Sequence, residues 1–311
     1  MTDVHFQRMK DLPSTHLLGA GTAMCAGCGG LEMIKEVYDV LGENTVFVNA
    51  AGCMTLLSVY PFTPFRGSWL YTAMASSPAG AQGVRDALDI LKANGRMTEE
   101  EDLEVVVLSG DGSASGMGLS ATSGAIDRGL DFIYLCYDNE GYGNTGQQTS
   151  PESPHGARTA TDAVGPGNIG YKKDLFSIWV ANKPAYAATV VGAEPLDLAR
   201  KIEKAHELEG PRLILSLAPC PTGWGYDPAH TVEIGRLAVK TGVWPLKEYV
   251  DGKVVHTRHP GKRTPVEAYL ETQDRFRHLF EPVRNDKVIA EIQARVDAYW
   301  AEVDVDDGTK A

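Results

Sequence analysis

Residues 107–149 constrain the fold more than any other part of the chain. The stretch opens with a β-branched apolar run that ends in a Gly-Asp-Gly sequence at 110–112, and a helix-compatible segment follows. A second apolar run at 132–137 leads into a polar cluster at 138–144. Strand, glycine-rich turn, helix, strand and polar loop predict one βαβ unit. Both polar clusters fall beyond the carboxyl ends of the strands, where ligands bind in such units.

The residue types in these clusters suit a magnesium ion that carries a diphosphate. Mg²⁺ prefers carboxylate, amide and carbonyl oxygens together with phosphate oxygens. We expect Asp111 to supply a carboxylate, Asn139 an amide oxygen and Gly141 its backbone carbonyl. Gly110 and Gly112 let the backbone turn sharply and approach a diphosphate, because neither carries a Cβ. A lone Gly-Asp-Gly is more often a plain turn, so this interpretation depends on the flanking strands and on the second cluster.

Composition excludes several classes of protein. The 311 residues are 43% hydrophobic and 23% charged, as in globular proteins that fold in water. A net charge of −12 argues against nucleic acid as the main partner. No apolar run approaches the ~20 residues that span a bilayer, so no membrane association is expected. The first 25 residues lack a signal-peptide pattern, so we expect a cytoplasmic protein whose five cysteines stay reduced.

Strands alternating with helices predict an α/β fold with a doubly wound, mostly parallel sheet. We expect an irregular arm at 1–20, one α/β domain at 21–245, and a small C-terminal extension at 246–311 that ends in an acidic tail from 303. A hairpin with an Asp-Gly turn is expected at 249–256. Residues 150–185 predict a long ordered loop folded over the site, with a disordered linker as the alternative. Helices are expected at 31–41, 79–93, 174–181, 195–207 and 231–241, and further strands at 45–49, 187–191 and 212–217.

Four of the five cysteines lie in predicted loops. Cys25 and Cys28 form a C-x-x-C pair, whereas Cys53 and Cys220 each follow a predicted strand. Because parallel strands end at one edge of the sheet, these distant cysteines can meet there. Four thiolates would hold a 4Fe–4S cluster or a structural zinc ion, and the spacing does not separate the two. Cys136 lies inside an apolar strand, where a cysteine acts as a small hydrophobic residue.

Several motifs together resemble a known family. In chain order they are CAGCG from Cys25, NAAGC from Asn49, Gly-Asp-Gly at 110–112 with YDNEGYGNTG from Tyr137, and APCPTGW from Ala218. Gly-Asp-Gly at 110–112 together with the polar cluster at 138–144 resembles the diphosphate–Mg²⁺ motif of thiamine diphosphate (ThDP) enzymes. The whole set resembles the ThDP-binding β subunit of 2-oxoacid:ferredoxin (acceptor) oxidoreductases, over roughly residues 20–280.

This resemblance implies an activity and a set of cofactors. The activity is oxidative decarboxylation of a 2-oxo acid with coenzyme A (CoA), giving an acyl-CoA, CO₂ and a reduced acceptor. The cofactors are ThDP with Mg²⁺ and one 4Fe–4S cluster, and Asn144 is expected to face the reacting centre as the catalytic residue. The implied ligand sets are Cys25, Cys28, Cys53 and Cys220 for the cluster, Asp111, Asn139 and Gly141 for Mg²⁺, and Gly110, Asp111, Gly112, Asn139, Gly141, Asn144 and Thr145 for ThDP.

The resemblance also implies partner chains. In the family the carboxylate that activates ThDP comes from the α subunit or domain. This chain also lacks the C-x₂-C-x₂-C-x₃-C runs that carry electrons onward. We therefore expect an α subunit, a ferredoxin-like electron-transfer subunit, and ferredoxin or another acceptor.

The substrate is predicted less directly. Pyruvate-type members resemble S-W-x-V-P-W-I-H, whereas this chain reads SWLYTAMASSPAG from Ser68. The missing Pro-Trp pair and the small residues favour a bulky or aryl 2-oxo acid such as phenylglyoxylate, with pyruvate as the alternative. Two other classes stay open: a non-redox ThDP decarboxylase or synthase, and a zinc-stabilised scaffold subunit.

Overall fold

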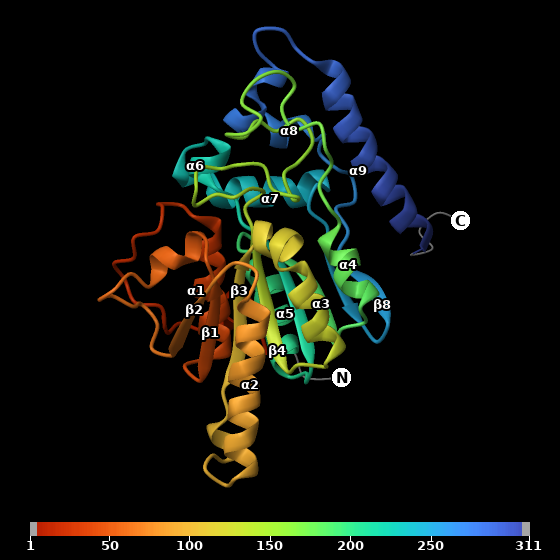
Figure 1. The fold of residues 1–311 in the computed structure, drawn as a ribbon. Helices are drawn as coiled ribbons and strands as arrows, with labels where there is room; N and C mark the ends of the chain where they lie inside the picture. The colour runs from red at the N-terminus through yellow and green to blue at the C-terminus, as the bar shows by residue number, and fades with distance from the viewer. Residues whose placement is uncertain (1–4, 307–311) are drawn as a thin grey trace.

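The computed structural model describes residues 5–306 and is built around one eight-stranded sheet (Figure 1). The strand order is β2-β1-β3-β4-β6-β5-β7-β8. The first six strands in this order are parallel, and β7 and β8 are antiparallel additions at one edge. The predicted doubly wound, mostly parallel α/β fold is therefore confirmed. The strands are β1 (Thr45–Ala50), β2 (Ser68–Thr72), β3 (Glu104–Gly110), β4 (Phe132–Asp138), β5 (Tyr186–Val191), β6 (Pro211–Leu217), β7 (Leu246–Val250) and β8 (Lys253–Arg258).

Helices cover both faces of the sheet, as a parallel sheet requires. On one face α1 (Gly29–Leu41) packs against α5 (Pro195–His206), and on the other α2 (Ser77–Ala93) packs against α3 (Leu119–Asp127). The predicted apolar face of α1 forms, with Met33, Ile34 and Val37 fully buried. These helices and alternate residues of the central strands form two cores, one on each face of the sheet. Figure 1 shows that α2 extends beyond the sheet at the amino ends of the strands, away from the loops at their carboxyl ends.

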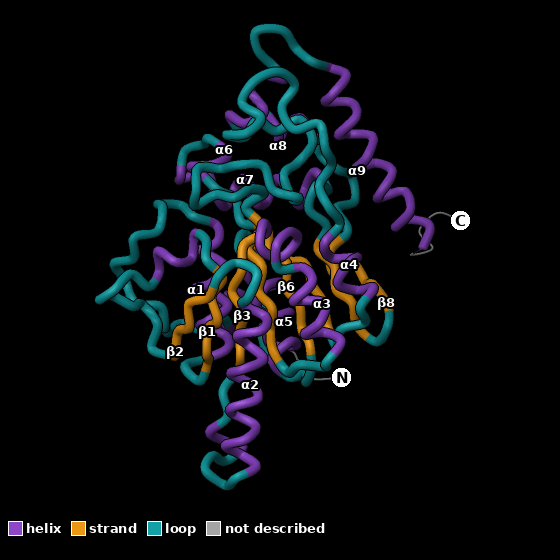
Figure 2. The backbone as a smooth tube through the Cα atoms, viewed as in Figure 1, coloured by secondary structure: helices purple, strands orange, loops and turns teal. Residues whose placement is uncertain are grey.

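A cap of loops and short helices lies over the carboxyl ends of the strands (Figure 2). Its long element is α9 (Asp286–Asp306), which runs along one side of the molecule. None of the described helices is long and apolar enough to cross a membrane. The remaining helices are α4 (Leu175–Ala181), α6 (Pro221–Trp224), α7 (Thr231–Thr241) and α8 (Glu267–Leu270), with single turns at Met9–Asp11, Cys53–Leu57, Glu99–Glu101, Pro228–His230 and Asp274–Leu279 and a π-helix at Gly112–Met117.

The structure differs from the predictions in three places. β2 was not predicted: it is an edge strand with a mostly exposed side-chain pattern, so it carries no apolar periodicity. The hairpin at 249–256 is confirmed with its turn at Asp251 and Gly252, but its strands extend the main sheet, so residues 246–258 do not stand apart from the α/β domain. The acidic tail was expected from 303, whereas α9 continues to 306; the rest of the tail, 307–311, and residues 1–4 of the arm lie outside the described residues.

The chain changes direction across the sheet between β1 and β3. From β1 it moves outward to β2 on one side, then returns to place β3 on the other side of β1. At such a switch point the loops after the two strands diverge and leave a crevice at their carboxyl ends. The loop after β1 carries Cys53, and the loop after β3 carries Asp111. The topology therefore brings the two predicted ligand sets to one edge.

Candidate functional site

Two adjoining cavities lie at this edge of the sheet. The first, of about 170 Å³, is lined by the ends of β1, β3 and β4 and by the loop at 141–145. The second, of about 380 Å³, is lined by all four loop cysteines. Both cavities share a wall, formed by Cys53, Tyr137, Asn139, Gly143 and Asn144. Groups bound in the two cavities would therefore be neighbours.

Three oxygen atoms converge in the first cavity. The side-chain oxygen of Asn139 lies 2.7 Å from Asp111 Oδ1 and 2.9 Å from the carbonyl oxygen of Gly141. Three acceptors this close repel one another unless a donor or a cation lies between them. If the Asn139 amide is turned over, its NH₂ group donates to both neighbouring oxygens. A magnesium ion between the three oxygens would instead supply a cation. The donor set of one carboxylate, one amide and one carbonyl fits Mg²⁺ with a diphosphate.

The carboxylate of Asp111 is fully buried. Burial and the neighbouring charge of Asp138 raise the pKa of Asp111 well above its ordinary value. Its Oδ2 accepts a hydrogen bond from Ser150 Oγ at 2.5 Å. A buried carboxylate with no basic side chain as direct partner among the described residues is costly to ionise. A dication in the cavity would remove that cost.

Two glycines are required by close contacts in the first cavity. A Cβ on Gly112 would lie 2.2 Å from Tyr142 Cε1, and one on Gly143 would lie 2.4 Å from Asn139 Nδ2. Neither position can accept a side chain without moving the ring or the amide. Close packing is therefore a further reason why both loops require glycine at these positions.

The four loop cysteines line the second cavity from three separate segments. Burial first, and then the neighbouring thiols, raise the pKa of Cys28 to about 11 and that of Cys53 to about 12. Cys136 is fully buried in β4 and lies in the sheet core, as predicted. Among residues 5–306 no three His, Cys, Asp or Glu side chains meet closely enough to hold a single metal ion. Four thiols around one cavity are a ligand set that a 4Fe–4S cluster or a structural zinc ion can use.

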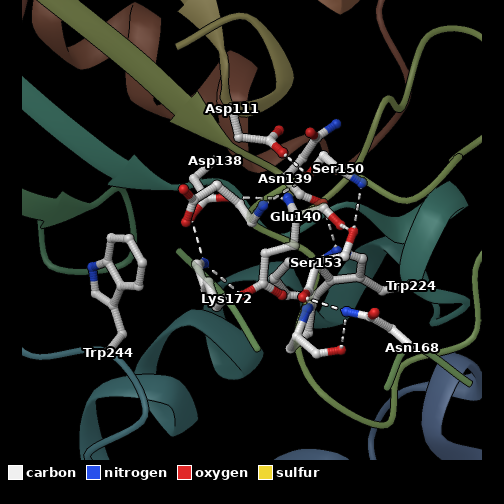
Figure 3. A network of polar contacts seen from close by, with 12 residues as sticks. Asp111, Asp138, Asn139, Glu140, Ser150, Ser153, Asn168, Lys172, Trp224 and Trp244 are labelled. Atoms are coloured by element: carbon white, nitrogen blue, oxygen red, sulfur yellow. Dashed lines mark hydrogen bonds and ion pairs between the residues drawn. The ribbon is translucent and has the colours of Figure 1, made fainter. Parts of the chain in front are cut away.

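A buried ionic network surrounds the chain on both sides of Asn139, next to the first cavity (Figure 3). Lys172 Nζ lies 2.5 Å from Asp138 Oδ2 and 2.8 Å from Glu140 Oε1. On its other side Glu140 pairs with Arg275 at 2.6 Å. Burial alone would raise the pKa of Glu140, but Lys172 and Arg275 hold it below its ordinary value. Asp138 and Glu140 flank Asn139 in the chain, so the network fixes the backbone on both sides of that residue.

Aromatic packing completes this support. The Arg275 guanidinium lies 3.9 Å from the ring centroid of Trp224, and Trp224 Nε1 donates to the carbonyl oxygen of Asn139 at 2.9 Å. Lys172 and Arg275 could not be predicted from the sequence, because their partners lie 32 to 135 residues away. Trp224 was noted only as the end of the APCPTGW motif.

The loop at 150–174 is ordered, and its side chains contact the residues of the same site. Ser150 Oγ donates to Asp111, and the backbone N–H of Glu152 donates to Ser150 Oγ at 3.1 Å. Ser153 Oγ donates to the carbonyl oxygen of Glu140 at 2.8 Å, and Asn168 Nδ2 donates to the carbonyl oxygen of Ser153 (Figure 3). The disordered-linker alternative is wrong for this segment, since its polar groups hold the residues around the oxygen cluster.

All the predicted site residues fall at the two cavities. The first cavity is lined by Gly110, Asp111, Gly112, Asn139, Gly141, Asn144 and Thr145. Thr145 Oγ1 donates to Gln148 Oε1 at 2.5 Å, which holds this end of the loop in a tight turn. Tyr71, Met74 and Tyr137 also line the first cavity.

Comparisons with known proteins agree with this geometry. The family "Thiamine pyrophosphate enzyme, C-terminal TPP binding domain" matches residues 50–215. Pyruvate synthase subunit PorB of Methanothermobacter thermautotrophicus is 43% identical over 296 residues, which cover 94% of this chain and 99% of that protein. Ketoisovalerate oxidoreductase subunit VorB of Pyrococcus abyssi is 37% identical, covering 88% of this chain and 89% of that protein.

Solved structures show the same fold. The 2-oxoglutarate:ferredoxin oxidoreductase of Magnetococcus marinus superimposes with a TM-score of 0.56 at 22% identity, covering 75% of this chain and 83% of that one. A family match over more than half of the chain, with relatives 37% to 43% identical across most of its length, establishes the assignment. The chain belongs to the family of ThDP-binding β subunits of 2-oxoacid:ferredoxin (acceptor) oxidoreductases.

Proposed function

We propose that this chain is the catalytic subunit of a cytoplasmic 2-oxoacid:acceptor oxidoreductase that forms an acyl-CoA. In this proposal it holds ThDP with Mg²⁺ in the first cavity and one 4Fe–4S cluster in the second. The single observation that carries the proposal is the shared wall of the two cavities. A non-redox ThDP enzyme has no use for four cysteines beside its cofactor, and a scaffold subunit has no use for the oxygen cluster.

The residues of the first cavity would bind and orient the cofactor. Asp111, Asn139 and the Gly141 carbonyl would hold Mg²⁺, while Gly112 lets the diphosphate approach the backbone. When bound, ThDP supplies a carbanion and an electron sink for decarboxylation, and the cluster supplies one-electron transfer. Asn144 lies in the shared wall, where its side chain can orient the reacting group of a substrate. The ionic network around Asn139 keeps that residue in place.

The remaining parts of the reaction come from other molecules. Partner subunits would supply the carboxylate that activates ThDP and the onward electron path to ferredoxin or another acceptor, and CoA would accept the acyl group. The family assignment supports subunit partners, since the relatives are named as subunits.

Pyruvate is the first candidate substrate. The relatives that are 40% to 43% identical over nearly their whole length are named as pyruvate synthase subunits. An aryl or branched 2-oxo acid is the second candidate, favoured by the absent Pro-Trp pair and by small residues at Ala73, Ser76 and Ser77. One relative is named for ketoisovalerate, which shows that similar chains serve enzymes for larger acids.

The test is acceptor reduction by the assembled complex with CoA and one 2-oxo acid at a time. The first candidate predicts that pyruvate has the highest kcat/KM of pyruvate, ketoisovalerate and phenylglyoxylate. If the small residues do open the pocket, phenylglyoxylate should exceed pyruvate by at least about 100-fold, because an aryl ring adds several methylene-sized contacts. Failure to reduce the acceptor with any 2-oxo acid would reject the proposed activity as a whole.

A further inference from the structure

A third cavity, of about 270 Å³, shares no lining residue with the two described above. It lies between the start of α4, the start of β7 and the middle of α9. Three aromatic side chains line it: Phe176, Trp244 and Tyr299. Further apolar side chains fill the spaces between the rings, so the lining resembles that of a binding pocket for an apolar body.

A buried cation points at this cavity. Lys247, on β7, is only 8% exposed, and its Nζ has no hydrogen bond or ion pair with any residue between 5 and 306. The ammonium lies over the rings of Phe176 and Tyr299, at 4.5 and 5.1 Å from their centroids. The ring faces attract a cation but do not replace hydrogen-bond acceptors for its three N–H donors. Burial lowers the pKa of Lys247, and the charge of Asp174 opposes that shift only in part.

Most other polar side chains of the lining already have hydrogen-bonded partners, and Arg295, which has none among the described residues, is exposed to water. Asp174 accepts hydrogen bonds from Ser177, and Tyr299 bonds to His256. Arg295 lies over the ring of Tyr171. The remaining satisfied groups are Lys172 with Glu140, Lys173 with the carbonyl oxygen of Ser115, Thr189 with that of Pro245, and Trp244 with that of Val190.

Glu152 is the second group of the lining that has no partner. Its carboxyl group is fully buried, and neither oxygen has a hydrogen-bond partner among the described residues. Burial first, and then the charge of Asp138, raise its pKa to about 9. At neutral pH this carboxyl is therefore protonated and can donate a hydrogen bond.

We propose that this cavity binds a small monocarboxylic acid with a flat apolar body, with Lys247 and Glu152 as donors to its carboxylate and the three rings around the body. The single positive charge of the buried Lys247 would be balanced by a ligand with one negative charge. Inorganic phosphate would bring a second charge and no apolar surface for the rings.

The unpaired ammonium also has a consequence for stability. A buried cation without acceptors destabilises the folded chain, so an apolar side chain of the same length should stabilise it. Lys247→Met should therefore raise the melting temperature of the complex measured without ligand. This measurement separates a binding role from a structural one, because a structural cation would lower the melting temperature when removed.

Equilibrium dialysis of labelled benzoate against the assembled complex tests the site. We expect wild type to bind benzoate, Lys247→Met to bind it about tenfold more weakly or worse, as loss of a charge-assisted hydrogen bond predicts, and Lys253→Met to bind as wild type does. Lys253 is a matched control because it is an exposed lysine on the neighbouring strand β8. Benzyl alcohol, which has the ring but no charge, should bind more weakly than benzoate.

Several results would overturn the proposal. Benzoate that fails to bind wild type, or that binds wild type and Lys247→Met equally, would place no carboxylate at Lys247. Phosphate that binds at Lys247 more tightly than benzoate would reject the monocarboxylate class. A lower melting temperature for Lys247→Met would show that the ammonium already has a structural partner.

Discussion

At the residue scale local spacing predicted which residues lie together at the two cavities, and their roles as ligands remain a prediction. Asp111, Asn139 and the four loop cysteines each follow a strand or stand in a glycine-rich loop, so chain position alone brings them to one edge. Lys172, Arg275 and Lys247 could not be predicted in the same way. Their roles depend on partners that are distant in sequence, and an isolated lysine or arginine looks like a solvated surface residue.

Asp111→Asn should weaken binding of ThDP with Mg²⁺ by about tenfold to a hundredfold, because one charged contact is worth ~1.5–3 kcal/mol. The substitution keeps the shape of the side chain and removes the anion that faces the dication. Calorimetric titration of the complex with ThDP and Mg²⁺ measures the effect. Asp127→Asn, at the exposed end of α3, is the control and should change nothing. Wild-type affinity in Asp111→Asn would reject this residue as the magnesium ligand.

Glu152 should make stability depend on pH. Its pKa is about 9 in the folded chain against an ordinary 4.5, so the folded state holds a proton that the unfolded state releases. Stability from this group is therefore fully present below about pH 4.5 and is lost as pH rises toward 9, with a slope of up to about 1.4 kcal/mol per pH unit. Glu152→Gln should flatten the fall in unfolding free energy between pH 5 and about 8, whereas the exposed Glu100→Gln should not. Parallel curves for wild type and Glu152→Gln would contradict the assignment.

At the element scale the regular strands and helices followed their sequence patterns. Apolar runs predicted β1, β4, β5 and β6, and periodicity predicted α1, α5 and α7. β2 was missed because an edge strand with exposed side chains has no apolar pattern. The contacts of the loop at 150–174 could not be predicted for a different reason. The loop is held by hydrogen bonds to Asp111, just after β3, and to Glu140, just after β4, and it has no sequence pattern of its own.

The turn at 274–279 is predicted to hold the site through one arginine. Arg275→Met would leave Glu140 buried with Lys172 alone and remove the stacking on Trp224, so the free energy of unfolding should fall by about 3–5 kcal/mol. Arg277→Met removes an exposed pair with Asp274 in the same turn and should leave stability nearly unchanged. Urea denaturation of both variants measures the difference. Equal midpoints would show that Arg275 contributes no more than a surface charge.

On the scale of the whole molecule, the fold class followed from the alternation of strands and helices, whereas the boundary at 245 did not match the sheet. β7 and β8 lie beyond residue 245 and add to the sheet edge as a hairpin. The large exposed side chains of residues 54–79 are a second whole-molecule feature. Tyr60 is 95% exposed and Phe62 is 75% exposed, which marks this tip as a surface that a partner subunit can cover.

The chain alone should be inactive toward 2-oxo acids, since we propose that other subunits supply its electron path and its activating carboxylate. Tyr60→Ser combined with Phe62→Ser should weaken assembly with those subunits, because it removes two aromatic anchors. Val283→Ser, at a residue that is 78% exposed in the cap, is the control and should assemble normally. Co-purification and analytical ultracentrifugation measure assembly. Turnover of a 2-oxo acid by the isolated, cluster-loaded chain would contradict this account.

The most direct test of two adjoining cofactor sites is the content of iron and ThDP in the anaerobically purified chain. Wild type saturated with ThDP and Mg²⁺ should contain about four irons and one ThDP per chain, as a single 4Fe–4S cluster and one cofactor require. Cys53→Ser should lose most of its iron, whereas Cys136→Ser should keep it because Cys136 lies in the sheet core. Equal iron in wild type and Cys53→Ser, or zinc in place of iron in wild type, would contradict the account.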